Sequence, residues 1–242
     1  MSKVNKYSKV KPASKRWQSL YRVGGIAALL AAIVFRRNLS AEVSLISPIQ
    51  PPQSAVDWFI LLYEHPLLGL TYMNLFDLLE YLLVGLMFLA VYVVMKKNHR
   101  SWMTIAVLIG WVGVGLNYSS NQAFAMLALS GKYMVVSSDF ASNMYLAAGE
   151  ALLAQSNGSA AYASLFFVSL AGLVMSIIML QSSLFSRLTG VLGILANGIM
   201  LLYFIVLPIA PSLLVLPFVL SAPFRVVWYI LVGLRLLKFT RK

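Results

Sequence analysis

Cysteine is absent from this 242-residue chain, histidine occurs only twice and acidic residues only seven times. The absence of cysteine excludes disulfides, thiolate metal sites and cysteine nucleophiles together. Charged residues make up 11% of the chain and hydrophobic residues 60%, and the mean hydropathy is +0.83. So little polar surface cannot cover a water-soluble globule of this length, and we therefore expect lipid to be the solvent of this protein.

The few charges are unbalanced, with 19 Lys and Arg residues and a formal net charge of +12. In a soluble protein this excess would indicate nucleic-acid binding, but here the cations flank apolar runs, as they do in cytoplasmic loops. Nucleic acid is therefore not an expected partner. Residues 1–19 are basic and have almost no apolar content, which predicts a cytoplasmic tail. The tail could bind anionic lipid head groups; the alternative is a topology signal without a ligand.

Six apolar runs predict six membrane-spanning helices, since about 20 apolar residues in a helix cross the hydrocarbon core. The runs are 20–35, 72–95, 102–127, 160–180, 188–207 and 212–238. A cleaved signal peptide is the alternative for the first run, but Arg36 and Arg37 stand where a small-residue cleavage site would be. The predicted fold class is thus an all-α polytopic membrane protein, with residues 20–242 forming a single six-span domain.

Two further segments predict short helices at the outer membrane interface. Ser54 and Asp57 form a capping box ahead of a helix over 55–64, which is too short to span the membrane and ends before Pro66. Residues 138–155 alternate apolar and polar positions at helical spacing, which predicts an amphipathic helix resting on the outer surface.

The distribution of charge predicts the orientation of the chain. Fifteen cations fall on one side of the six-span arrangement, seven of them up to Arg22, three around His99, Arg187 alone, and four from Arg235 onward. All seven acids, from Glu42 to Glu150, fall toward the other side. The positive-inside rule then assigns both termini to the cytoplasm, and we expect a prokaryotic cytoplasmic membrane.

Three ionisable residues inside predicted spans form the candidate site. A charge near the bilayer centre costs roughly 2.5 to 3.5 kcal/mol on insertion scales, so Asp77, Glu80 and Arg225 each need a reason. Counted back from the basic ends of their helices, Glu80 and Arg225 lie at about the same depth, which predicts an ion pair of Arg225 with Glu80 or Asp77. The pair could only lock helix register, or it could form the floor of an outward-facing pocket to which Asn117 and Asn121 contribute.

Catalytic, metal and cofactor sites are not expected. The two histidines, His65 and His99, fall on opposite sides of the predicted membrane, so they cannot share a metal or an active site. A serine nucleophile would lack a histidine base within any span. Haem would lack histidine axial ligands there.

Three stretches resemble a bacterial and archaeal family of six-helix integral membrane proteins, a domain of unknown function. They are DLLEYLLVGLMFLAVYVVMKKNHR, an acid-bearing second span ending in a basic turn, the amphipathic ASNMYLAAGEALLAQ, and SRLTGVLGILANGIMLL. The resemblance covers the hydropathy and loop lengths of roughly residues 20–238. It implies a compact bundle of six spans with no established activity.

We therefore expect an accessory, binding or structural subunit of a larger membrane complex or of a homo-oligomer. Its small-residue faces, 24–32 and 110–115, would lie against the partner, because small residues permit close helix approach. Two alternatives remain open at this point: a small-solute or lipid transporter that uses the outer polar cluster, and an intramembrane lipid-modifying enzyme.

Overall fold

The structure is a computed structural model that describes residues 17–42, 52, 54–97 and 99–240, with the backbone alone for 37–42. Every regular element in this part of the chain is helical. In chain order the elements are α1 (Gln18–Glu42), α2 (Ala55–Glu64), α3 (Pro66–Tyr72), α4 (Leu75–Met95), α5 (Arg100–Ser120), α6 (Ala123–Val135), α7 (Asp139–Ser156), α8 (Ser159–Gln181), α9 (Arg187–Ile209), the 3-10 turn η2 (Pro211–Leu213) and α10 (Val215–Thr240). Apart from residues 17–19, the predicted basic tail lies outside the described residues.

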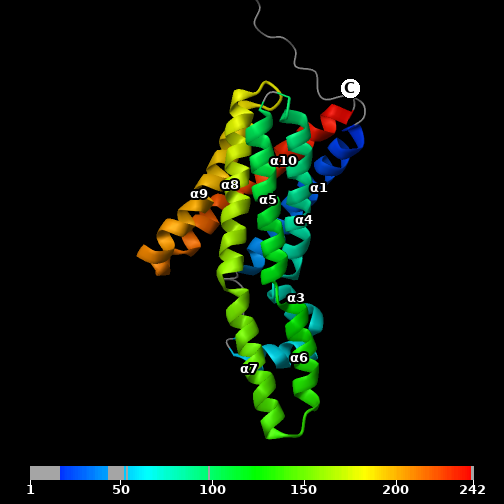
Figure 1. The fold of residues 1–242 in the computed structure, drawn as a ribbon, viewed down its shortest axis with the longest axis vertical. Coiled ribbons are helices and arrows are strands. Elements are labelled where there is room, and N and C mark those ends of the chain that lie inside the picture. The colour runs from blue at the N-terminus through cyan, green and yellow to red at the C-terminus, as the bar shows by residue number, and fades with distance from the viewer. Residues whose placement is uncertain (1–16, 43–51, 53, 98, 241–242) are drawn as a thin grey trace, which may run out of the picture.

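Six helical stretches are long and apolar enough to cross a membrane, as predicted. They contain α1, α4, α5, α8, α9 and α10, which stand side by side as one bundle (Figure 1). Around the bundle each helix contacts the next in the order α4, α1, α10, α9, α8, α5 and back to α4. The fold is therefore a closed ring of six spanning helices.

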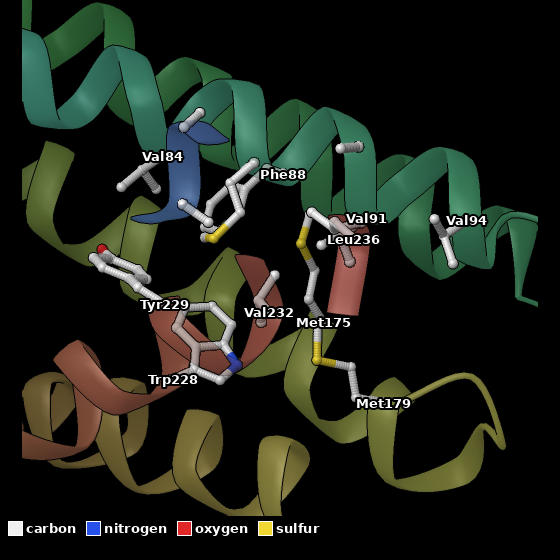
Figure 2. Packing of buried hydrophobic residues seen from close by; sticks show 14 of the residues in the cluster. Val84, Phe88, Val91, Val94, Met175, Met179, Trp228, Tyr229, Val232 and Leu236 are labelled. Atoms are coloured by element: carbon white, nitrogen blue, oxygen red, sulfur yellow. The ribbon is translucent and has the colours of Figure 1, made fainter. Parts of the chain in front are cut away.

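Apolar side chains of α1, α4, α5, α8 and α10 fill the ring. Figure 2 shows Met175 and Met179 of α8 reaching toward Val91 of α4 and Leu236 of α10, and all four side chains are buried. Flexible methionine side chains suit such an interior because they fill irregular gaps between rigid neighbours.

Small residues set the closest helix contacts. A Cβ atom added at Gly24 of α1 would lie 2.2 Å from the Ala90 Cβ of α4, and one at Gly113 of α5 would lie 2.7 Å from the Val168 Cγ2 of α8. The glycine faces 24–32 and 110–115, which we expected to meet a partner, thus pack mainly within the chain. The exception is Gly115, around which a Cβ would meet no atom within 4 Å.

Most of the described cations gather at one end of the bundle. The side chain of Lys96, at the end of α4, lies over the Trp17 ring just before α1, with 4.6 Å between its Nζ and the ring centroid. Arg235 of α10 donates from its Nε to the Leu184 carbonyl in the α8–α9 loop at 2.5 Å. Arg187, which begins α9, follows the same loop. This clustering is the charge asymmetry that the sequence predicts.

At the opposite end, α6 continues in line with α5 and α7 in line with α8 (Figure 1). We call the helical layer formed by α2, α3, α6 and α7 the extension. It has a hydrophobic core of its own, built on the buried side chains Phe59, Leu62, Leu70, Ala123 and Met126. The extension was not predicted as a separate layer.

Two segments differ from their predicted form. The third predicted span, 102–127, is interrupted at Asn121 and Gln122, so that α5 ends at Ser120 and α6 begins at Ala123. The helix predicted over 138–155 is present as α7, but it projects beyond the bundle with α6 and does not lie flat across the bundle end (Figure 1). Pairing with α6 and α2 accounts for the difference, because α7 packs on them through Tyr145, Leu146, Gly149, Leu152 and Leu153, whereas Phe140 and Met144 of its predicted apolar face stay exposed.

The helix predicted over 55–64 is present as α2, and it docks on α7. The Ser54 hydroxyl accepts a hydrogen bond from the Asp57 amide at 3.2 Å, as the capping box requires. The Glu150 carboxylate of α7 accepts a second one from the Ala55 amide at 2.9 Å, which satisfies another free N–H at the helix start. Gly149 lies directly against the first half of α2, since an added Cβ would be 2.6 Å from the Phe59 Cζ and 3.2 Å from the Ala55 Cβ.

We expect Gly149→Ala to loosen the contact between α2 and α7. The Phe59 ring is fully buried, so displacing it disturbs its neighbours, and overpacking of this kind costs about 1 to 3 kcal/mol. Amide hydrogen exchange over 55–64 should therefore accelerate by about tenfold or more. Gly131→Ala in α6 is the matched control, because nothing lies within 4 Å of its added Cβ; equal acceleration in both variants would contradict this packing.

Candidate functional site

A pocket of about 400 Å³ lies where the bundle meets the extension. It forms at the three helix breaks that separate these layers. The α3–α4 break contributes Met73 and Asn74 to the lining, the α5–α6 break contributes Asn121, and the α7–α8 break contributes Asn157. The pocket therefore exists because three helix pairs are interrupted at the same level.

Two asparagines shape two of these breaks, Asn74 through its backbone and Asn121 through its side chain. Asn74 adopts the left-handed conformation, with φ 59° and ψ 37°, which asparagine tolerates better than most residues. Asn121 donates from its Nδ2 to the Asn74 carbonyl at 3.1 Å and to the Met73 carbonyl at 3.4 Å. Its Oδ1 accepts from the Ala123 amide at 3.2 Å. Asn121 thus fastens the α3–α4 turn to the start of α6.

The remaining polar lining consists of amide and hydroxyl side chains, which both donate and accept hydrogen bonds, and of one carboxylate. Asp77, in the first turn of α4, is the single charged residue among the described lining residues. The Oδ1 atom of Asn117 in α5 is buried and has no hydrogen-bond partner. Trp58 and Tyr72 contribute aromatic walls. The pocket lining is therefore polar, with one acidic side chain and two aromatic rings.

Glu80 and Arg225 lie outside this pocket lining, buried within the bundle. Their side chains are 5% and 7% exposed, respectively. Tyr81 lies within electrostatic range of Asp77, Glu80 and Arg225, so the three ionisable groups share one region between α4 and α10. The Arg225 guanidinium stacks over the Phe35 ring of α1 at 5.3 Å. Its Nε and Nη2 atoms are buried without a hydrogen-bond partner.

The predicted polar cluster thus divides into two parts. Asp77, Asn117 and Asn121 line the pocket, whereas Glu80 and Arg225 lie in the bundle interior. The ion pair of Arg225 with an acid of α4 stays a prediction. Sequence reasoning missed Asn74 and the lining contributed by the α7–α8 break, although an Asn-Gly pair at 157–158 marks that break.

The histidines lie far apart in the molecule. His65 connects α2 with α3 in the extension, and His99 precedes α5 at the opposite end of the bundle. Among the residues that the structure describes, no group of three His, Cys, Asp or Glu side chains could hold a metal ion.

Together, the ring of six apolar helices and the cations gathered at one of its ends define a multi-pass membrane protein. Comparison with protein-family models, curated proteins and solved structures gives no match to this chain. The resemblance to the six-helix family therefore stays a prediction.

Proposed function

We propose that this protein is a non-catalytic subunit of a prokaryotic cytoplasmic membrane that binds a partner protein on the outer side through the tip of its extension. The observation that carries the proposal is a set of exposed apolar side chains where α6 meets α7, which we call the apolar tip. Val135 is 75% exposed, Phe140 76% and Met144 59%.

The position of the apolar tip supports contact with a protein. The 13 residues of α6 extend about 20 Å beyond the end of α5, which by itself is long enough to cross the hydrocarbon core. Placing the hydrocarbon core on α5 and the helices beside it puts the apolar tip beyond the lipid. Large apolar side chains grouped in water are typical of interaction surfaces.

The assignment of the extension to the outer side follows from charge. Lys96, Arg187 and Arg235 lie at the other end of the bundle, and cytoplasmic ends carry the excess of cations. With that end in the cytoplasm, both termini are cytoplasmic and the apolar tip meets an extracytoplasmic partner.

The test is purification from native membranes in mild detergent, followed by mass spectrometry of copurifying proteins. We expect one complex with the unaltered chain and its loss from the double variant Val135→Ser/Phe140→Ser. Leu67→Ser is the matched control, because Leu67 is 79% exposed on α3 yet lies away from the tip. Identical copurification by the tip variant and the unaltered chain would contradict the proposal.

A small-solute or lipid carrier is the second candidate, and the pocket is the observation that favours it. A carrier must open its site to each side of the membrane in turn. Beneath the pocket, however, Glu80 and Arg225 are buried among the packed helices. The accessory role needs no such opening, and we therefore prefer it.

A further inference from the structure

The cations at one end of the bundle have no acidic neighbours along the sequence. The chain has no Asp or Glu before Glu42, between Glu80 and Asp139, or after Glu150. The α4–α5 turn, the α8–α9 loop and the end of α10 all fall within these acid-free stretches and meet at this end (Figure 1). The described cations there are Arg22, Lys96, Lys97, Arg100, Arg187, Arg235 and Lys238. Their charge is therefore left to be balanced by anions from the surroundings.

The α4–α5 turn carries the densest part of this charge. Lys96, Lys97 and Arg100 fall within the stretch 96–100. Lys96 is half-buried, and its Nζ lies 4.6 Å from the centroid of the Trp17 ring and 5.5 Å from that of the Tyr92 ring. The Lys97 and Arg100 side chains are exposed. The turn thus presents two exposed cations beside a third that is held against aromatic rings.

The turn has the features of a segment at the depth of the lipid head groups. Trp102 follows Arg100 closely and is 61% exposed, and Trp17 lies against Lys96. Tryptophan is enriched at the head-group level of membranes. The connections at this end are short, since 96–99 join α4 to α5 and 182–186 join α8 to α9. The described chain therefore forms no layer beyond this end of the bundle, and the nearest phosphate groups are those of the membrane itself.

The chemistry of the turn suits a phosphodiester with net negative charge. An arginine guanidinium can donate two parallel hydrogen bonds to a phosphate, and a lysine ammonium adds a mobile charge beside it. A zwitterionic lipid brings a cation together with its phosphate, and that cation would meet the like charges of the turn. An anionic head group meets no such repulsion. The turn therefore favours an anionic lipid over a zwitterionic one.

From these features we propose that the α4–α5 turn binds the head group of an anionic phospholipid, with Lys97 and Arg100 on its phosphate and Trp102 against its glycerol and upper acyl chains. The lipid belongs to the leaflet at this end of the bundle, which is the cytoplasmic leaflet in the orientation proposed above. The site lies on the helical bundle and is separate from the basic residues before Trp17. It is also independent of the partner that binds the apolar tip.

The experiment uses the full chain in detergent micelles and two lipids with identical acyl chains, phosphatidylglycerol and phosphatidylcholine. Native mass spectrometry measures how much of each lipid the protein retains. We expect phosphatidylglycerol to be retained about tenfold or more over phosphatidylcholine, because each cation near the membrane surface strengthens the binding of anionic lipid by about fivefold. A DNA oligonucleotide at the same concentration should not displace the lipid.

Three variants locate the binding site. Lys97→Gln/Arg100→Gln removes both exposed cations of the turn and should weaken retention of phosphatidylglycerol by about tenfold or more. Arg187→Gln/Lys238→Gln is the matched control, because it removes two exposed cations of the same bundle end from α9 and α10 and should leave most of the retention in place. Lys97→Arg keeps the charge and should retain the lipid as the unaltered chain does. All four positions are exposed, so the variants should fold, which their melting profiles check.

Four results would overturn the proposal. The first is equal retention of phosphatidylglycerol and phosphatidylcholine. The second is unchanged retention in Lys97→Gln/Arg100→Gln, which would leave the lipid to another part of the chain. The third is an equal loss in the two double variants, which would show attraction to the charged end as a whole. The fourth is displacement of the lipid by the oligonucleotide, which would assign the cations to nucleic acid.

Discussion

Replacing Arg225 with methionine should strongly destabilise the protein. Arg225 is 7% exposed and shares its region with Glu80, which is 5% exposed. Removing one partner of a buried ion pair leaves an uncompensated charge, and this typically costs about 3 to 5 kcal/mol. We expect Arg225→Met to lower the free energy of unfolding, measured by SDS titration with circular dichroism, by an amount in this range.

The double variant decides whether the destabilisation comes from the pair. Glu80→Gln/Arg225→Met removes both charges and should recover most of the stability that either single variant loses, because no buried charge then lacks a partner. Arg187→Met is the control for loss of a cation, since Arg187 is exposed at the start of α9. Strictly additive effects of the two single variants would show that Glu80 and Arg225 do not interact.

The second large effect is expected where α5 crosses α8. At Gly113 an added Cβ would lie 2.7 Å from Val168 Cγ2 and 3.0 Å from both the Val168 amide nitrogen and the Ser164 carbonyl oxygen. Backbone atoms cannot rotate away as a side chain can, so Gly113→Ala must move the helices apart. It also strains the hydrogen bond that Ser164 Oγ donates to the Gly113 carbonyl at 2.7 Å. We expect a loss of about 1 to 3 kcal/mol in the free energy of unfolding.

Gly115 offers a control two residues away on the same helix. Nothing lies within 4 Å of an added Cβ there, so Gly115→Ala meets no obstacle. Alanine also favours the helical state over glycine, by up to about 1 kcal/mol. The two substitutions should therefore change the melting temperature in opposite directions, and a similar loss in both would refute the close crossing at Gly113.

The six spans could be predicted because each is an apolar run bounded by charged or turn-forming residues. The break at Asn121 was missed although the polar residues of 117–122 mark it, because the apolar stretches before and after them were joined into one run. Pro66 does follow the end of α2, as predicted, but it also begins α3, since proline is well suited to the first position of a helix.

The candidate site could be predicted only in part. Asp77, Asn117 and Asn121 could be selected because a polar side chain inside an apolar run is unfavourable unless it has a structural or functional role. The pocket itself depends on three helix breaks lying at the same level of the bundle. The local sequence around each break does not predict that the three breaks lie at this common level. The packing partners of the small-residue faces could not be predicted either. Glycine spacing predicts that another helix packs closely, but it does not show whether that helix belongs to the same chain.

The pairing of α1 with α10 has a consequence for biogenesis. Gly25 of α1 packs against Leu237 and Gly233 of α10, so two segments from opposite ends of the sequence close the ring. During synthesis α1 enters the bilayer long before α10 emerges from the ribosome, and such distant contacts form late. Until then one side of α1 faces lipid or an insertion factor, and a nascent chain that stalls before α10 is left as an open, incomplete bundle.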